Sequence, residues 1–245
     1  MAGHNKWKQI KHKKALTDAK KGAAFSRIVR EITVAAREGG ASPDSNIRLR
    51  AAMDRARSEG LPKDNIERAL LRARGQGDAQ ELFEFLYEAV GPSGTAILIE
   101  GITDSTNRTF NELRHLLSEH ACRLAEAGSL LWSFEKIGAL TVTSADNPGK
   151  TADEIETAII ESGALNYARH EDANDTWDIE TAFGAQDAVR RELLARHIAV
   201  ADIGHDYKPR SPITLPPDAA AALEKILDAI LDYDDVQEIY TNARN

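Results

Sequence analysis

Cysteine, long apolar runs and aromatic residues are scarce in this chain of 245 residues. The lone cysteine, Cys122, excludes an internal disulfide and a zinc site built from paired cysteines. No segment approaches the roughly 20 apolar residues that cross a membrane, and no apolar stretch follows the basic N-terminus as it would in a secretory signal. We therefore expect a cytoplasmic protein of a reducing compartment, without a membrane partner.

Positive charge is outnumbered overall, with 31 Lys and Arg against 39 Asp and Glu, but it is concentrated at one end. Residues 1–77 contain 18 Lys and Arg against 8 Asp and Glu, whereas the remaining 168 residues contain 13 against 31. The two parts carry net charges of +10 and -18, which add up to the formal net charge of -8. A basic module fits a polyanion such as nucleic acid, and an acidic remainder would restrict the contact to one end of the chain.

The opening segment, MAGHNKWKQIKHKKALTDAKKG (residues 1–22), is the most basic stretch. It holds seven Lys and one acid, Asp18, and its single large aromatic, Trp7, lies within the Lys cluster. A large aromatic is unexpected in a solvated tail, because nothing there packs on it. In a segment that binds nucleic acid, it can stack on a base while the lysines contact phosphates. We interpret residues 1–22 as an arm that contacts nucleic acid, with a disordered tail as the alternative. Its composition is neutral between DNA and RNA.

Helical patterns follow the arm. The segments AAFSRIVREITVAAREGG, SPDSNIRLRAAMDRARSEG and LPKDNIERALLRARGQG each repeat apolar residues at helical spacing. The glycines at the ends of the first two, at positions 39, 40 and 60, are typical helix stops. We predict a domain of three helices over residues 23–79. Its Arg68 and Arg72 lie four residues apart and share a helix face.

From about residue 80 the pattern changes to strands mixed with helices. ELFEFLYEAV fits a strand or a helix, TAILIEGIT is a buried strand, and GSLLWSFEKIG is a further strand. Between the last two we predict a helix from about Thr109 to His120, with Thr109 and Glu112 as a capping box.

The order of elements predicts how this region is organised. Residues 137–207 show the order strand, helix, strand, strand, helix, strand of a ferredoxin-like unit. The C-terminal segment supplies only a strand, a helix and a strand, starting with RSPITL. We therefore predict an α+β protein in which a ferredoxin-like domain (137–207) is inserted into a second one, split between residues 80–136 and 208–245.

No spacing in the sequence indicates a catalytic or metal site. The seven His form no HExxH or Cys/His cluster, and GPSG lacks the glycine patterns that bind phosphate. The acidic pairs Asp234/Asp235 and Glu171/Asp172 read as solvated turns, and DSTNRT (104–109) as helix capping. We expect no catalytic residues, no metal and no cofactor. An enzyme with a site between the α+β domains, or a protein-interaction adaptor, are the less favoured alternatives.

Several segments resemble the YebC/PmpR family across almost the whole chain. The opening is similar to the family pattern MAGHSKWxxIKHRKxxxDAKRG. Later blocks align in order: REITVAAREGG, NIRLRAAMDRA, LPKDNIERA, YEAVGPSG, TDSTNRT, GSLLWSFEKIG and DDVQEIYTNA. The chain departs from the family where YEAVGPSG replaces YEGYGPGG and where residues 121–125 replace a Gly-Gly-Asn-Leu-Gly segment.

The resemblance implies a helical N-terminal domain, two α+β domains, and neither catalytic residues nor cofactors. Family members are described as transcriptional regulators that bind DNA. Others associate with the ribosome and help it through difficult stretches, notably proline-rich ones, and mitochondrial relatives activate translation of cytochrome c oxidase. We therefore expect a non-enzymatic, monomeric regulator of gene expression that binds DNA, with a ribosome-associated factor that contacts ribosomal RNA or tRNA as the alternative.

The expected nucleic-acid contacts come from the two parts of the basic module. The resemblance implies those of the arm: Lys6, Trp7, Lys8, Lys11, His12, Lys13, Lys14, Lys20 and Lys21. The charge of the helical module adds Arg27, Arg30, Arg68 and Arg72.

Overall fold

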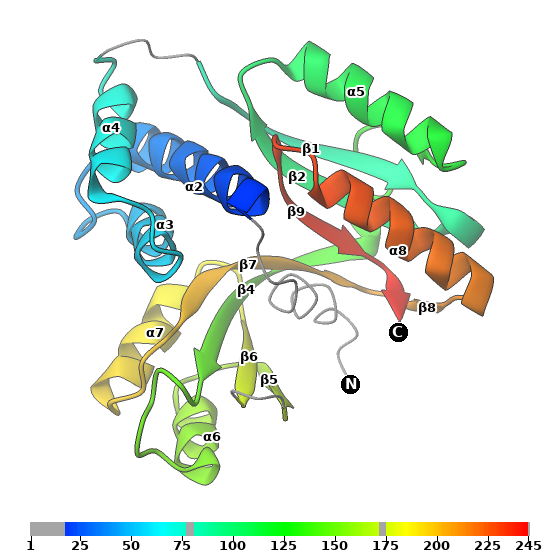
Figure 1. Ribbon diagram of the computed structural model, residues 1–245. Coiled ribbons are helices and arrows are strands. Elements are labelled where there is room, and N and C mark those ends of the chain that lie inside the picture. Colours follow the sequence, from blue (N-terminus) through cyan, green and yellow to red (C-terminus); the bar gives the residue numbers. More distant parts are fainter. Residues whose placement is uncertain (1–17, 77–80, 172–174, 245) are drawn as a thin grey trace. The chain divides into compact units, whose positions relative to one another are not determined.

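The computed structural model describes residues 18–76, 81–171 and 175–244. They form helices and largely antiparallel sheets, which confirms the α+β class (Figure 1). Contacts between Cα atoms separate the described residues into two units: Glu135–Lys208 form one, and residues 18–134 with 209–244 form the other. The finer division into an arm, a helical domain, a split domain and an insert stays a prediction.

The described N-terminal part is a bundle of α2 (Asp18–Gly39), α3 (Ile47–Ser58) and α4 (Lys63–Ala73), as the helical patterns predict. Helix α2 begins at Asp18, however, and so includes the end of the segment 1–22 that we interpret as the arm. Gly40 and Gly60 follow α2 and α3 with positive φ angles of 86° and 76°, which glycine adopts without strain. Asn46 caps α3, because its side chain accepts a hydrogen bond from the amide of Leu49. The apolar faces of the helices meet in a core that includes Ile28, Ile32, Leu49, Ala52, Ile66 and Ala69.

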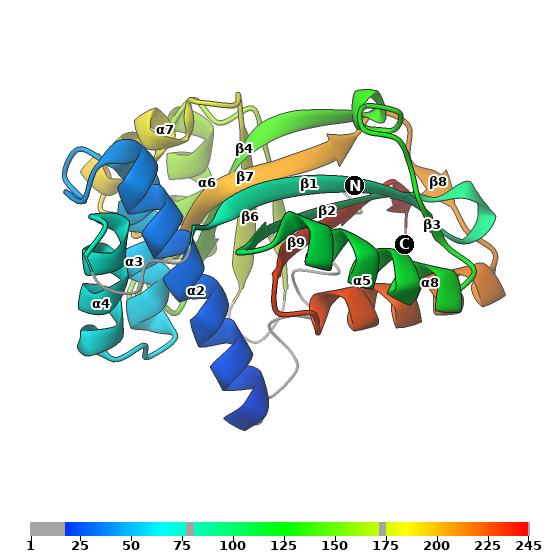
Figure 2. The same cartoon turned by 90° about the horizontal axis from the view of Figure 1, so that it is seen from above.

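The same unit contains a sheet in the order β3-β1-β2-β9. Its strands are β1 (Phe83–Val90), β2 (Ala96–Thr103), β3 (Arg123–Leu124) and β9 (Val236–Thr241). The pairs β1/β2, β1/β3 and β2/β9 are all antiparallel. One face of the sheet is covered by α5 (Thr106–Glu119) and α8 (Pro217–Leu231), which run side by side (Figure 2).

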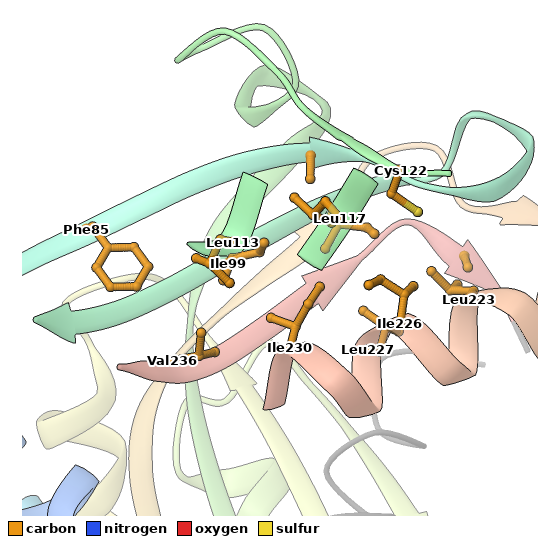
Figure 3. Packing of buried hydrophobic residues seen from close by; sticks show 13 residues of the cluster. Phe85, Ile99, Leu113, Leu117, Cys122, Leu223, Ile226, Leu227, Ile230 and Val236 are labelled. Carbon is orange, nitrogen blue, oxygen red and sulfur yellow. The ribbon is translucent and has the colours of Figure 1, made fainter. Parts of the chain in front are cut away.

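Apolar side chains hold these helices on the sheet. Leu113 and Leu117 of α5 and Ile226 and Ile230 of α8 are fully buried against the strands, and Figure 3 shows them converging with Ile99 of β2. Burial of this kind contributes about 1.5–3 kcal/mol per large aliphatic side chain. The two helices come from segments that the other unit separates in sequence, so this core joins residues 83–124 to residues 217–241. We call this α+β part of the unit the split domain.

The structure keeps some of the predicted strands of this domain and changes the extent or the place of others. The segment ELFEFLYEAV, left open between strand and helix, forms β1 at the centre of the sheet. GSLLWSFEKIG is a strand only in its second half, where β4 (Phe134–Thr143) of the other unit begins, and its first half contains the short helix η2 (Leu131–Ser133). The edge position predicted for this segment in the present sheet is taken by β3. RSPITL contributes β8 (Ile213–Thr214), which pairs with β10 (Ala243–Arg244) in a separate ladder. Counted from its other edge, the sheet has the order β9-β2-β1-β3, which is the strand order of a ferredoxin-like unit. The third position is filled by β1, which comes before the other strands in sequence.

The other unit is ferredoxin-like, as predicted for residues 137–207. Its elements are β4 (Phe134–Thr143), α6 (Ala152–Glu161), β5 (Asn166–His170), β6 (Thr176–Thr181), α7 (Gln186–Ala195) and β7 (Asp202–Pro209). The strand order β5-β6-β4-β7 is the one expected for two interlocked βαβ units. Trp177, Ile155, Ile159 and Leu193 lie at the centre of its core.

Candidate nucleic-acid interface

The predicted interface begins with the arm, most of which lies outside the described residues. This applies to Lys6, Trp7, Lys8, Lys11, His12, Lys13 and Lys14. Lys20 and Lys21 fall within the backbone of α2, but their side chains lie outside the described part. Their contacts with nucleic acid stay a prediction.

Arg27 and Arg30, also predicted to contact nucleic acid, bind the protein itself. Arg27 donates to the carbonyl oxygens of Leu231, the last residue of α8, and of Tyr233, in the turn between α8 and β9. Arg30 donates to the carbonyl of Asp234 at 2.6 Å and forms an ion pair of 2.9 Å with Asp235. Burial lowers the pKa of Arg27 against the opposing effect of nearby acids. These arginines therefore attach α2 to the split domain, and a contact with phosphate would require them to leave it.

Two more arginines of the helical bundle make similar attachments. Arg37 donates to the carbonyl of Leu82 at 2.5 Å, and Arg48 pairs with Glu84 at the start of β1. Part of the positive charge that the sequence assigns to nucleic acid is thus used for joining the bundle to the sheet. The sequence gives no sign of this, because the acceptors are backbone carbonyls and acids far along the chain.

Helix α4 differs, because its arginines are exposed. Arg68 and Arg72 lie on one exposed face, as their spacing predicts, and Arg74 follows at the exposed C-terminal end. Arg68 donates only within its own helix, to Asp64 and Asn65. Among the residues that the structure describes, no side-chain hydrogen bond or ion pair involves Arg72 or Arg74. The described part of the basic module therefore offers its accessible positive charge chiefly on α4.

A buried aspartate with several partners was missed by the sequence reasoning, which placed Asp235 in a solvated turn. The Asp235 side chain is only 3% exposed. It accepts hydrogen bonds from Thr103 at 2.9 Å and Thr109 at 2.7 Å, and it forms ion pairs with Arg30 and Arg108, each at 2.9 Å. We call these five residues the Asp235 cluster. The only hint in the sequence was the DSTNRT segment, which holds Arg108 and Thr109 near an apolar strand.

The electrostatics of the cluster favour a charged carboxylate. Desolvation by burial alone would raise the pKa of Asp235, but hydrogen bonds from Thr109, Arg108 and Thr103 outweigh it and lower the pKa. The carboxylate thus joins α2, α5 and the end of β2 to the turn before β9. Both oxygens of the buried carboxylate have protein partners, Arg30 on one and Thr103, Thr109 and Arg108 on the other, which indicates a structural role.

The predicted start of helix α5 is also corrected. The helix begins at Thr106, with Ser105 at the cap position, and not at Thr109. Thr109 is buried inside the first turns, where its hydroxyl bonds Asp235 and Thr103. The expected capping box of Thr109 and Glu112 is therefore wrong, because tertiary contacts claim the threonine.

The remaining candidates for chemistry are metal-binding groups and the single cysteine. No group of His, Cys, Asp and Glu suited to a metal ion occurs within residues 18–76, 81–171 and 175–244. Cys122 is buried in the split-domain core, where desolvation raises the pKa of its thiol, so it is poorly suited to nucleophilic chemistry. No helix in the described part of the chain is long and apolar enough to cross a membrane.

Comparisons with known proteins decide the family. The model of the TACO1/YebC protein N-terminal domain matches residues 5–76, and the model of the TACO1/YebC second and third domain matches residues 82–243. The chain belongs to the TACO1/YebC family. The resemblance of its opening block and later segments to YebC proteins is thereby confirmed.

Relatives of this TACO1/YebC protein span its full length. One from Carboxydothermus hydrogenoformans is 40% identical over 242 residues, which are 99% of this chain and 98% of the relative. Another, from Thermomicrobium roseum, is 41% identical over 244 residues, with 99% and 96% covered. Both are named "probable transcriptional regulatory protein". The names of these relatives are those of regulators and not of enzymes.

A solved structure extends the comparison to the fold. The crystal structure of a conserved hypothetical protein from Aquifex aeolicus matches with a TM-score of 0.88 and 33% identity. The match covers 97% of this chain and 96% of the other. The architecture described above is thus shared within the TACO1/YebC family.

Proposed function

We propose that this protein is a non-enzymatic regulator of gene expression that binds nucleic acid through its basic N-terminal module, with DNA as the first candidate. The observation that carries the proposal is the separation of charge: residues 1–77 carry a net of +10 and the rest of the chain -18. The regulatory name of the relatives supports the same class of function.

The arginines of the basic module differ in how accessible they are to a phosphate. Arg27 and Arg30 are held by the split domain, whereas Arg68 and Arg72 stand exposed on α4. We therefore propose that the arm and α4 supply the phosphate contacts and that Arg27 and Arg30 orient α2. Phosphate contacts position a protein on nucleic acid but do not read its sequence.

The alternative function is that of a translation factor that contacts ribosomal RNA or tRNA and relieves stalled ribosomes. Structured RNA is recognised largely by shape, phosphate and stacking, and needs no set of base-reading side chains in a groove. A Lys-rich arm with a Trp suits this mode as well as it suits DNA. The two candidates differ in the polyanion and not in the surface that binds it.

The test compares duplex DNA and ribosomes as ligands of the full chain. Binding is measured across salt concentrations for wild type, for a Lys8/Lys11/Lys13/Lys14→Glu variant and for an Arg68/Arg72→Glu variant. Each lost phosphate contact should reduce the slope of log affinity against log salt by about 0.9 on duplex DNA. The matched control is Arg190/Arg191→Glu on α7, which makes the same charge change as the α4 variant in the acidic part of the chain.

The results separate the candidates. Loss of DNA binding in the arm and α4 variants, with the α7 control unaffected, supports the DNA proposal. Loss of ribosome cosedimentation alone transfers the proposal to translation. If neither ligand binds in a salt-dependent and arm-dependent way, the nucleic-acid function is wrong.

A further inference from the structure

The side chain of Trp132 is unusually exposed for a large aromatic. It lies in η2 and is 72% exposed, the highest value among the large hydrophobic residues that the structure describes. Tryptophan is usually highly buried, since exposing it forgoes a large favourable transfer free energy. An exposed Trp in a folded segment is therefore a candidate contact point for another molecule.

Trp132 lies in the segment of residues 124–133, which is fixed by hydrogen bonds to a buried acid. Glu88 of β1 is 4% exposed, and its carboxylate accepts hydrogen bonds from the backbone amides of Gly128, Leu130 and Leu131. Ser133 adds a bond from its hydroxyl to the carbonyl of Leu130 at 2.6 Å. A segment fixed in this way loses little conformational entropy on binding, as in pre-organised interfaces.

The indole itself restricts what can bind. Its Nε1 already donates to the carbonyl of Ser129 at 2.7 Å. A partner therefore meets the faces and edge of the ring and needs no hydrogen-bond acceptor for it. Such a surface suits stacking by another flat ring, which is tolerant of the identity of that ring.

Charge near the segment favours an anionic partner. Arg123 is exposed on β3 at one end of the segment. Arg210 is exposed at the other end, where its backbone amide donates to the carbonyl of Ser133 at 2.8 Å. Glu126, within the segment, and Glu135, shortly after it in sequence, are exposed acids, and Lys136 follows Glu135. Two cations at the ends of the segment contrast with the net negative charge of the rest of the acidic part.

We propose that Trp132 is a stacking platform for an unpaired nucleobase, with Arg123 and Arg210 beside the phosphates that flank it. The inference rests on the proposed nucleic-acid function and extends it, because it adds a contact in the split domain to those of the basic module. It also selects a ligand class: single-stranded or bulged nucleic acid offers an unstacked base, whereas a regular duplex does not.

The test compares a single-stranded RNA of about 12 nucleotides with a duplex of the same length, using the full chain and fluorescence anisotropy of the labelled nucleic acid. The variants are Trp132→Ala, Trp132→Phe and the Lys8/Lys11/Lys13/Lys14→Glu variant. The control is Phe183→Ala, which removes an aromatic ring that is 59% exposed in the other unit. Circular dichroism verifies that each variant is folded.

The expected result is selective. Trp132→Ala should weaken single-strand binding about 10-fold and leave duplex binding unchanged, because the stack of an unpaired base on the indole is lost and a duplex offers no such base. Trp132→Phe should remain within about 3-fold of wild type, since a smaller ring still stacks, and Phe183→Ala should have no effect.

Three results would overturn the inference. One is equal affinity of Trp132→Ala and wild type for the single strand, and another is an equal loss on single strand and duplex. The third is unchanged affinity for the single strand together with weakened ribosome cosedimentation, which would assign Trp132 to a ribosomal surface and not to an unstacked base. In the first case an arm-dependent affinity in the same assay would leave the proposed function standing, whereas the absence of any arm-dependent binding would remove that function as well.

Discussion

Asp235 and Glu88 are both buried acids of the split domain, yet they are satisfied in different ways. Asp235 is held by side chains, namely Thr103, Thr109, Arg30 and Arg108. Glu88 is held by backbone amides of residues 128, 130 and 131. The first joins elements that are far apart in sequence, and the second shapes one nearby segment.

The difference shows what each acid controls. Removing Asp235 would leave Arg30 without its ion pair and would release the attachment between α2 and the α8–β9 turn, so its effect should reach the orientation of the basic module. Removing Glu88 would free amides that can bond water once the segment opens, so its effect should remain local. A buried acid matched by ionised side chains is also harder to replace than one matched by backbone, because its partners are left charged.

The largest effect is expected from Asp235→Asn. The amide cannot satisfy the guanidinium groups of Arg30 and Arg108, and breaking a buried pair typically costs about 3–5 kcal/mol. The partial exposure of both arginines places the expected loss in the free energy of unfolding near the lower end, at about 3 kcal/mol. Urea denaturation followed by circular dichroism measures it.

Asp234→Asn is the matched control for that variant. The neighbouring side chain is exposed, so the same substitution there should change the free energy of unfolding by less than about 0.5 kcal/mol. Equal effects of the two variants would show that Asp235 has no special role.

The next effect is the pH dependence of the same variant. The pKa of Asp235 is lowered in the folded state, so its contribution is fully present above the unfolded pKa of about 3.9 and is lost as the pH falls through the folded value. The difference in unfolding free energy between wild type and Asp235→Asn should therefore be largest at neutral pH and should shrink at about pH 3. A difference that stays constant between these pH values would contradict the assignment of the ion pairs.

The smallest effect is expected from Glu88→Gln. An amide replaces one acceptor oxygen, so at least one of the backbone amides of residues 128–131 loses its bond, at a cost of about 1–2 kcal/mol. Hydrogen exchange of these amides should accelerate about 10-fold while the sheet keeps its protection. Glu126→Gln, at an exposed acid of the same segment, serves as the control, and unchanged exchange in Glu88→Gln would refute the proposed restraint.

The helices were the part of the fold that sequence patterns predict well. In α2 and α3 the apolar spacing predicts each helix, and Gly40 and Gly60 predict its end. Both signals lie in one short stretch of sequence. The same holds for the alternation of elements that indicated the ferredoxin-like unit around α6 and α7. Local signals suffice wherever the apolar face and the stop lie in one continuous segment.

The strands of the split domain were harder, for a physical reason. β1 reads equally well as a helix, and what decides it is the pairing of Phe83–Val90 with Ala96–Thr103 along its whole length. β3 is two residues long and exists because it extends that ladder. Strand pairing is a contact between segments, so a pattern within one segment cannot choose among possible partners.

The sequence by itself determined the helical N-terminal domain, the α+β class, the family and the strong separation of charge, because each is written in the order and composition of neighbouring residues. The tertiary structure alone decided which cations remain accessible. Nothing in the sequence distinguishes Arg27 and Arg30 from Arg68 and Arg72, since all four are arginines of the basic module. Arg27 and Arg30 are nevertheless held by carbonyls and a carboxylate some 200 residues away in sequence, whereas Arg68 and Arg72 are exposed. Charge can be counted along a chain, but its partners are set by distances in space.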